Sequence, residues 1–248
     1  MEISLVRYPS GLREESAKLR FVGSNPTRTS SMKRTCHSRL YTIDEDFFNK
    51  WTPEMSYVLG FWFADGYMRH EKSYRIIFFE NDKEILEQIK RVLKSTHHIR
   101  KNKKDNCYFL NICSKKLYQR LQELGGCRRK SKTVNFPDIP ADYLRDYIRG
   151  YFDGDGSVFY VKYNSTRDKK QRLELRSNFT CGSKMFLEKL ENILRKKISF
   201  KKKRLGVYDG GSSWKLGYGT KETIKLLKFI YYSNFSLGLQ RKAVFCYK

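Results

Sequence analysis

The sequence contains the same short helical stretch twice. The first copy, residues 57–66, reads YVLGFWFADG, and the second, residues 147–156, reads YIRGYFDGDG. Superposing Gly60 on Gly150 also superposes Asp65 on Asp155, because 150 − 60 and 155 − 65 both equal 90. A chain that repeats itself at a constant shift is expected to fold as two related units.

The spacing of small residues in this repeat predicts that the two helices pack closely. Gly60 and Ala64 are four residues apart, as are Gly150 and Gly154, so each pair lies on one helix face. Small residues at this spacing let two helix backbones approach each other. We expect a helix pair packed through these four residues. The glycines that follow, Gly66 and Gly156, are expected to end each helix in the left-handed conformation.

The acids of the repeat would then lie at two helix C-termini. Asp65 and Asp155 meet the negative end of the helix dipole there, and at ~4 Å they would repel each other by roughly 4 kcal/mol at an effective dielectric of 20. A divalent cation removes this repulsion, and Mg²⁺ prefers carboxylate and carbonyl oxygens. We therefore predict a Mg²⁺ site formed by Asp65, Asp155 and the backbone at Ala64 and Gly154. The alternative is two unrelated Asp-Gly helix ends.

The two stretches resemble the two motifs of a LAGLIDADG homing endonuclease in its single-chain form. The second copy matches strongly, while in the first Phe63 stands where many members have an acid that does not bind metal. The resemblance covers about residues 51–248 and assigns the metal-binding acids to Asp65 and Asp155. It also implies that Lys130 and Lys242 are catalytic, as basic residues around the attacking water. Ordinary phosphate contact is the alternative for both lysines.

The rest of the chain repeats in the same order. Residues 81–94 and 183–196 are predicted amphipathic helices with matching apolar faces at a shift of 101. Together with the strand-like segments, this predicts an α+β fold made of a duplicated αββαββα unit with pseudo-two-fold symmetry. The resemblance implies that two antiparallel sheets form a concave saddle, with the motif helices at the interface. We place repeat 1 at residues 51–136 and repeat 2 at residues 137–248.

The N-terminal residues 1–50 differ from the repeats, being basic and lacking hydrophobic periodicity in their first part. We expect this segment to be poorly ordered. Residues 23–26, Gly-Ser-Asn-Pro, are what one frame of a tRNA gene would encode. This motivates the hypothesis that residues 1–31 are read through from a neighbouring tRNA gene, with Met32 as the native start. A disordered basic tail is the alternative.

The charge of the chain indicates a polyanionic partner. Lys and Arg number 51 against 26 acids, a net charge of +25, which favours double-stranded DNA. Basic residues gather at the predicted hairpin tips and on the polar face of the strand at residues 171–180, where a ribbon can reach the major groove. The predicted DNA contacts are Arg69, Arg75, Lys103, Lys104, Arg167, Lys169, Lys170, Arg172, Arg176, Lys201 and Lys203.

The resemblance implies a site-specific endonuclease. It would make a metal-dependent double-strand break at a long pseudo-palindromic target, during homing of an intron or mobile element. A maturase that binds its host intron RNA without cutting DNA is the main alternative. A transcription regulator that has lost the chemistry is a second, disfavoured because both acids are present. With no apolar run near ~20 residues and no secretory signal, we expect an intracellular monomer, in the cytoplasm, the nucleoid or an organelle.

Overall fold

The computed structural model describes residues 40–71, 73–102, 107–128, 130–164 and 170–246, in which the same order of elements occurs twice. The first half contains α1 (Pro53–Asp65), β1 (Gly66–His70), β2 (Tyr74–Glu80), α2 (Lys83–Val92), β3 (Ile99–Lys101), β4 (Tyr108–Cys113) and α3 (Lys115–Glu123). The second contains α4 (Leu144–Asp155), β5 (Gly156–Asn164), β6 (Gln171–Cys181), α5 (Lys184–Lys197), β7 (Gly206–Tyr208), β8 (Ser213–Tyr218) and α6 (Thr220–Ile230), followed by α7 (Gln240–Ala243). The predicted α+β fold with a duplicated αββαββα unit is confirmed.

The two sheets have the same topology and register. Their strand orders are β1-β2-β4-β3 and β5-β6-β8-β7, and the neighbouring strands pair antiparallel. Gly66 lies opposite Phe78 in the first sheet, and Gly156 lies opposite Phe179 in the second. Phe78 and Phe179 are therefore equivalent, which extends the sequence repeat at a shift of 101 from the helices to the strands.

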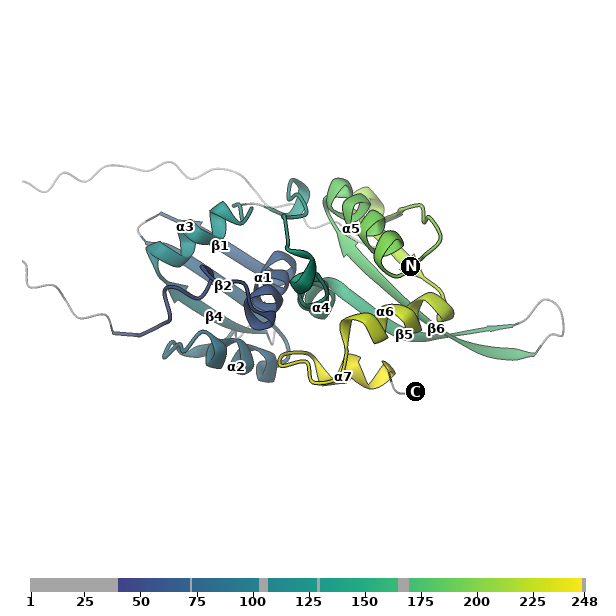
Figure 1. Cartoon of the computed structure of the whole chain (residues 1–248), viewed down its shortest axis with the longest axis horizontal. Coiled ribbons are helices and arrows are strands. Elements are labelled where there is room, and N and C mark those ends of the chain that lie inside the picture. Colours follow the sequence, from purple (N-terminus) through teal and green to yellow (C-terminus); the bar gives the residue numbers. More distant parts are fainter. Residues whose placement is uncertain (1–39, 72, 103–106, 129, 165–169, 247–248) are drawn as a thin grey trace, which may run out of the picture. The chain divides into compact units, whose positions relative to one another are not determined.

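The motif helices α1 and α4 lie side by side in the centre, with one sheet on each side (Figure 1). Each helix contributes a glycine that packs against the backbone of the other helix. A Cβ on Gly60 would lie 2.0 Å from the carbonyl oxygen of Tyr147, and a Cβ on Gly150 would lie 2.1 Å from that of Tyr57. Since either Cβ would overlap the facing backbone, only glycine allows this approach. The predicted helix packing is found.

The glycines after the acids do not have the left-handed conformation that the sequence suggested. Gly66 and Gly156 both have φ of −89°, in the extended region, and each begins a strand directly. A Cβ would lie 2.2 Å from the Trp62 ring at Gly66, and 2.2 Å from the Phe152 ring at Gly156. Glycine is required here because an aromatic side chain of the preceding turn covers the position, and not for backbone freedom.

Helices cover one face of each sheet and leave the other open. The predicted apolar face of α2, with Ile85, Leu86 and Ile89, is buried, and so is that of α5, with Phe186, Leu187 and Leu190. The strands alternate accordingly, and the second sheet turns Leu175 and Phe179 to the core. None of the helices in the described part of the chain has the length and apolar character needed to cross a bilayer.

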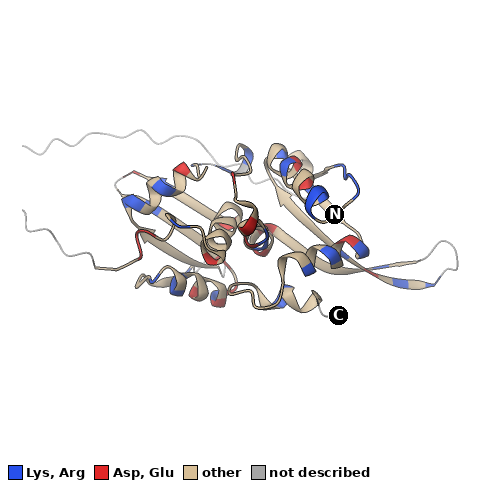
Figure 2. Ribbon diagram, viewed as in Figure 1, with Lys and Arg blue, Asp and Glu red and all other residues tan. Residues whose placement is uncertain are grey.

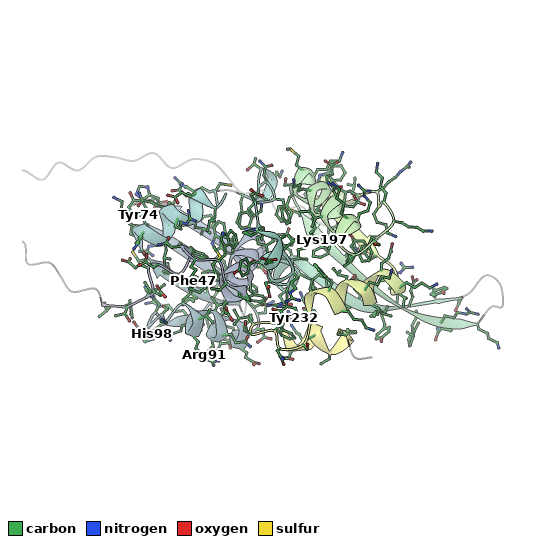
Figure 3. All side chains as sticks on the ribbon, viewed as in Figure 1. Phe47, Tyr74, Arg91, His98, Lys197 and Tyr232 are labelled. Carbon is green, nitrogen blue, oxygen red and sulfur yellow. The ribbon has the colours of Figure 1, made fainter. Side chains whose placement is uncertain are left out.

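Residues 40–50 differ from the sequence expectation of a poorly ordered segment. Phe48 is buried in the core, the amide of Asp44 donates to the carbonyl of Leu93 at 3.0 Å, and Ser114 donates to Glu45 at 2.7 Å. Figure 3 shows Phe47 within the half that contains the first sheet. Phe48 anchors this lead-in in the core, and the two hydrogen bonds attach it to the residue after α2 and the residue before α3. Residues 1–39, including the proposed read-through segment, lie outside the described residues.

Candidate active site and nucleic-acid interface

The packing of α1 against α4 brings the two predicted acids to one place. Asp65 and Asp155 are the last residues of the two helices. Next to them Ala64 faces Gly154, since a Cβ on Gly154 would lie 2.4 Å from the Ala64 Cβ and 2.8 Å from the Asp65 carboxylate. The carboxylate of one repeat therefore lies against the motif helix of the other. Figure 2 shows acidic residues on this central helix pair, between the two sheets.

Burial perturbs the pKa of both acids, and the charge of Asp155 raises the pKa of Asp65 further. The pKa of Asp65 is raised to about 7, first by burial and then by the charges of Asp155 and Glu80. Burial also raises the pKa of Asp155, against the opposing charges of Lys130 and Lys242. Two carboxylates that disfavour each other's charged form are typical of a site that binds a cation.

The two predicted lysines lie against equivalent points, the C-terminal ends of the motif helices, and come from later segments of each repeat. The ammonium of Lys130 donates to the carbonyls of Phe63 at 2.7 Å and Ala64 at 2.6 Å, at the end of α1. The ammonium of Lys242 donates to the carbonyls of Phe152 and Asp153, both at 2.7 Å, and of Gly156 at 2.6 Å, at the end of α4. Each lysine thus satisfies backbone carbonyls at the C-terminal end of one motif helix, and Lys242 also binds the first carbonyl of β5.

This geometry limits what the lysines can do directly. A lysine ammonium has three N–H donors, and Lys242 uses all of them on backbone carbonyls. Burial lowers the pKa of Lys242 to about 8 and also lowers the pKa of Lys130. Both charges in turn lower the pKa of Asp65 and Asp155. In this arrangement Lys242 acts on the acids through its charge, and it has no free donor for a phosphate.

The donor set suits a hard divalent cation. Two carboxylates meet at helix ends that are rich in carbonyls, although the Ala64 carbonyl is occupied by Lys130. Among the described residues no group of three or more His, Cys, Asp or Glu side chains could hold a metal. A metal at Asp65 and Asp155 would complete its shell with other oxygens, of which backbone carbonyls such as that of Gly154 and the phosphates of a nucleic acid are the candidates.

A pocket of about 680 Å³ opens beside Asp65. Repeat 1 contributes Asp65, Glu80 and Asn81, while Arg241 and Lys242 come from repeat 2. Ser157, the second residue of β5, also lines it. The pocket thus combines acids and cations from both repeats at the inner end of the open sheet face.

The predicted DNA contacts in the strands lie on the open faces. Arg69 faces Arg75 across β1 and β2, and the Arg75 guanidinium donates to Ser73 at 2.8 Å. In the second sheet Arg172 is exposed, while Arg176 pairs with Glu174 at 2.8 Å. Figure 2 shows Lys and Arg on these strands and on the helices as well. The open faces begin directly after Asp65 and Asp155, so a duplex on them would pass over both acids.

The remaining predicted DNA contacts do not all lie on the open sheet faces. Lys170 is exposed beside β6, and Lys201 is exposed in the segment before β7. Lys203 was expected to start a strand, but β7 begins at Gly206, and the Lys203 ammonium pairs with Glu222 of α6 at 2.7 Å. It therefore lies beside the helices. The predicted contacts outside the described residues are Lys103, Lys104, Arg167 and Lys169.

Two acids near the site were not singled out from the sequence. Glu80 is the last residue of β2 and lies near Asp65. Its place in the repeat follows only from the strand register, which makes Glu80 equivalent to Cys181. Asp153 is buried on α4 and accepts hydrogen bonds from Tyr57 at 2.8 Å, from the Leu239 amide at 3.0 Å and from Tyr231. The sequence repeat could have singled out Asp153, because the matching position of α1 holds Phe63 and not an acid.

Comparison with known proteins identifies the domain and the fold. Residues 52–126 match the family model of the LAGLIDADG-like domain. This match lies within the first repeat. A search of curated protein sequences returned no match.

Among solved structures, the I-DmoI homing endonuclease variants align with a TM-score of 0.55 and 16% identity, over 83% of this chain and 100% of theirs. The I-LtrWI LAGLIDADG homing endonuclease bound to target DNA aligns with a TM-score of 0.53 and 15% identity, over 81% and 88%. The LAGLIDADG meganuclease I-AabMI bound to uncleaved DNA aligns with 0.54 and 16%, over 78% and 87%. The chain has the fold of the LAGLIDADG homing endonucleases along most of its length.

Proposed function

We propose that this protein is a site-specific DNA endonuclease that hydrolyses one phosphodiester bond in each strand of a duplex. The observation that carries the proposal is the meeting of Asp65 and Asp155 where two glycine-packed helices end. Two perturbed carboxylates, flanked by buried lysines and open basic sheets, suit a reaction on a polyanionic backbone. The fold shared with DNA-bound endonucleases supports the choice of duplex DNA.

The residues of this chain have distinct roles in the proposed reaction. Asp65 and Asp155 hold divalent metal, for which we propose Mg²⁺; when bound, it activates water and stabilises the leaving oxygen. Lys130 and Lys242 lower the pKa of the two acids, which favours the ionised form that binds metal, and they add positive charge near the scissile phosphates. Arg69, Arg75 and Arg172 on the open faces hold the duplex in register by contacts to phosphates or bases.

The pseudo-symmetry of the chain sets the form of the target. Two similar sheets on either side of one acid pair fit a long, pseudo-palindromic site read by a monomer. Such an enzyme is suited to homing of an intron or mobile element, in which a rare long site is cut once. Because the target DNA lies inside the cell, we propose that the protein acts there.

The test is a cleavage screen of the full chain against duplexes with randomised half-sites in the presence of Mg²⁺. We expect double-strand breaks at a defined sequence, which chelation of the metal abolishes. Asp65→Asn and Asp155→Asn should abolish the break and leave DNA binding intact, while the exposed-acid control Asp138→Asn should cut normally. Full cleavage by Asp155→Asn would refute the site. Binding of DNA or intron RNA without any cutting by the unaltered chain would favour a maturase or a regulator.

A further inference from the structure

The open face of the first sheet carries an apolar patch at its inner end, next to the acids. The patch consists of four side chains that point away from the helices, namely Tyr67 of β1, Ile77 and Phe79 of β2, and Phe109 of β4. Their neighbours along the strands, such as Met68 and Phe78, are buried in the core. Tyr67 is 41% exposed and Phe79 is 36% exposed. Contiguous apolar side chains left open on a folded protein mark an interaction site.

The four side chains form one continuous surface across three strands. Tyr67 lies opposite Ile77 in the pairing of β1 with β2, and Phe79 lies opposite Phe109 in the pairing of β2 with β4. The ring centroids of the two phenylalanines are 6.2 Å apart. Phe79 also lines the pocket of about 680 Å³ that contains Asp65. The apolar patch therefore borders the candidate active site.

Cations on the same face indicate what covers the apolar patch. Arg69 and Arg75 face each other across β1 and β2, one step further from Asp65 along the strands. Arg100 of β3 is exposed and lies opposite Phe109. A partner of this face must therefore combine negative charge with apolar groups. The major groove of duplex DNA does so, because phosphates flank the 5-methyl groups of thymine, and apolar side chains can read those methyl groups directly.

The second sheet is polar at the equivalent positions. The strand registers align the four members of the apolar patch, in the order given above, with Ser157, Asn178, Thr180 and Lys215. Thr180 lies opposite Lys215, as the two phenylalanines of the patch do in the first sheet. The apolar side chains of this open face, Phe159 and Val161, lie further along β5 from Asp155. The apolar patch next to the acids is thus a feature of repeat 1.

We propose that the apolar patch reads thymine 5-methyl groups in the innermost base pairs of the half-site that lies on the first sheet. This inference rests on the proposed endonuclease function and names the base chemistry that this half-site requires. Ile77 and Phe79 contact the methyl groups, while Arg69 and Arg75 contact phosphates or bases further out. At the matched base pairs of the other half-site, side chains that form hydrogen bonds take the place of the patch.

The experiment compares thymine with uracil, which lacks only the 5-methyl group. The full chain first selects a target in the cleavage screen, and titration of labelled duplexes without added metal then measures the affinity. Uracil in place of the innermost thymines of one half-site should weaken binding about fourfold for each methyl group that the patch buries. Uracil at the matched positions of the other half-site should leave the affinity unchanged.

Two variants assign this effect to the apolar patch. Ile77→Ala and Phe79→Ala should each bind the thymine target more weakly than the unaltered chain does. Each should also lose the discrimination against uracil at the base pair that its side chain contacts, because the methyl group then has no partner to lose. Met185→Ala, which truncates an exposed apolar side chain of α5, is the matched control and should discriminate fully.

A selected target without thymine at the innermost positions would overturn the inference. Equal affinity for thymine and uracil, equal weakening from both half-sites, or discrimination that survives in both alanine variants would also overturn it. Each of these results leaves the endonuclease function intact, because cleavage of the selected target is established first. If the unaltered chain neither binds nor cuts any duplex, the proposed function and this inference both fail.

Discussion

Gly60 of α1 and Gly150 of α4 make the same contact in opposite directions. Each fits against the carbonyl oxygen of the tyrosine that precedes the other glycine by three residues, at 2.0 and 2.1 Å from where a Cβ would be. This reciprocal contact sets the distance between the two helices. Because Asp65 and Asp155 follow each glycine by five residues, it also sets the place where the acids meet.

Replacing either glycine should therefore destabilise the fold. Gly60→Ala and Gly150→Ala place a methyl group inside a facing carbonyl, and overpacking of this kind costs about 1–3 kcal/mol or more. The free energy of unfolding in urea measures the loss. Gly217→Ala is the matched control, since nothing lies within 4 Å of its Cβ position. Equal stability of the three variants would show that the helices do not pack as described.

The raised pKa of Asp65 predicts that removing its charge stabilises the protein at neutral and alkaline pH. The folded pKa is about 7 and the ordinary value 3.8, so folding loses stability as the pH rises through this window. Asp65→Asn removes that cost and should raise the free energy of unfolding at pH 8 by at most ~4 kcal/mol. Chemical denaturation at pH 8 and pH 4 measures it, and the gain should largely vanish at pH 4.

The same variant also reports on metal. In thermal unfolding at pH 8, Mg²⁺ should stabilise the unaltered protein more than Asp65→Asn, because the charge that favours the cation is gone. The exposed control Asp138→Asn should respond to Mg²⁺ as the unaltered chain does. An identical response of all three proteins would count against metal binding at Asp65.

Asp153 should be essential for stability. It accepts from Tyr57, Tyr231 and the Leu239 amide, so it ties α1 and the segment after α6 to α4. Next to Tyr231, the Tyr232 hydroxyl donates to Asp146 of α4 at 2.8 Å, and Tyr232 is labelled in Figure 3. Asp153→Leu leaves three buried donors unpaired and should cost about 3 kcal/mol. Urea unfolding of this variant, against the exposed control Asp142→Leu, measures the difference.

The open sheet faces should bind DNA mainly through charge. Arg75→Gln and Arg172→Gln each remove one proposed phosphate contact, so each should reduce the slope of log K against log salt by about 1. Titration of a labelled duplex at several salt concentrations measures the slope. Lys189→Gln, on the exposed side of α5, is the control and should leave it unchanged. A slope altered equally by Lys189→Gln would argue against contact through the sheets.

The repeat allowed much of the fold to be predicted from residues alone. The apolar faces of α2 and α5 were visible because helix periodicity places their residues together, and the small residues of α1 and α4 indicated close packing. The start of β7 was placed too early, because Lys203 continues a strand-like pattern but pairs with Glu222. The ordered lead-in at residues 40–50 was missed, because apolar residues such as Phe48 gain burial only once the rest of the core is assembled.

The sequence by itself determined the duplication, the helix pair and the two acids, since these follow from the identity and spacing of residues along one helix. The tertiary structure decided what surrounds the acids. That Lys242 uses its three donors on the end of α4, that Glu80 approaches Asp65 and Arg241, and that Gly66 is extended beneath Trp62 all depend on contacts between segments distant in sequence or on the exact turn of the chain. Spacing along a helix encodes the first kind of fact, while only packing in three dimensions sets the second.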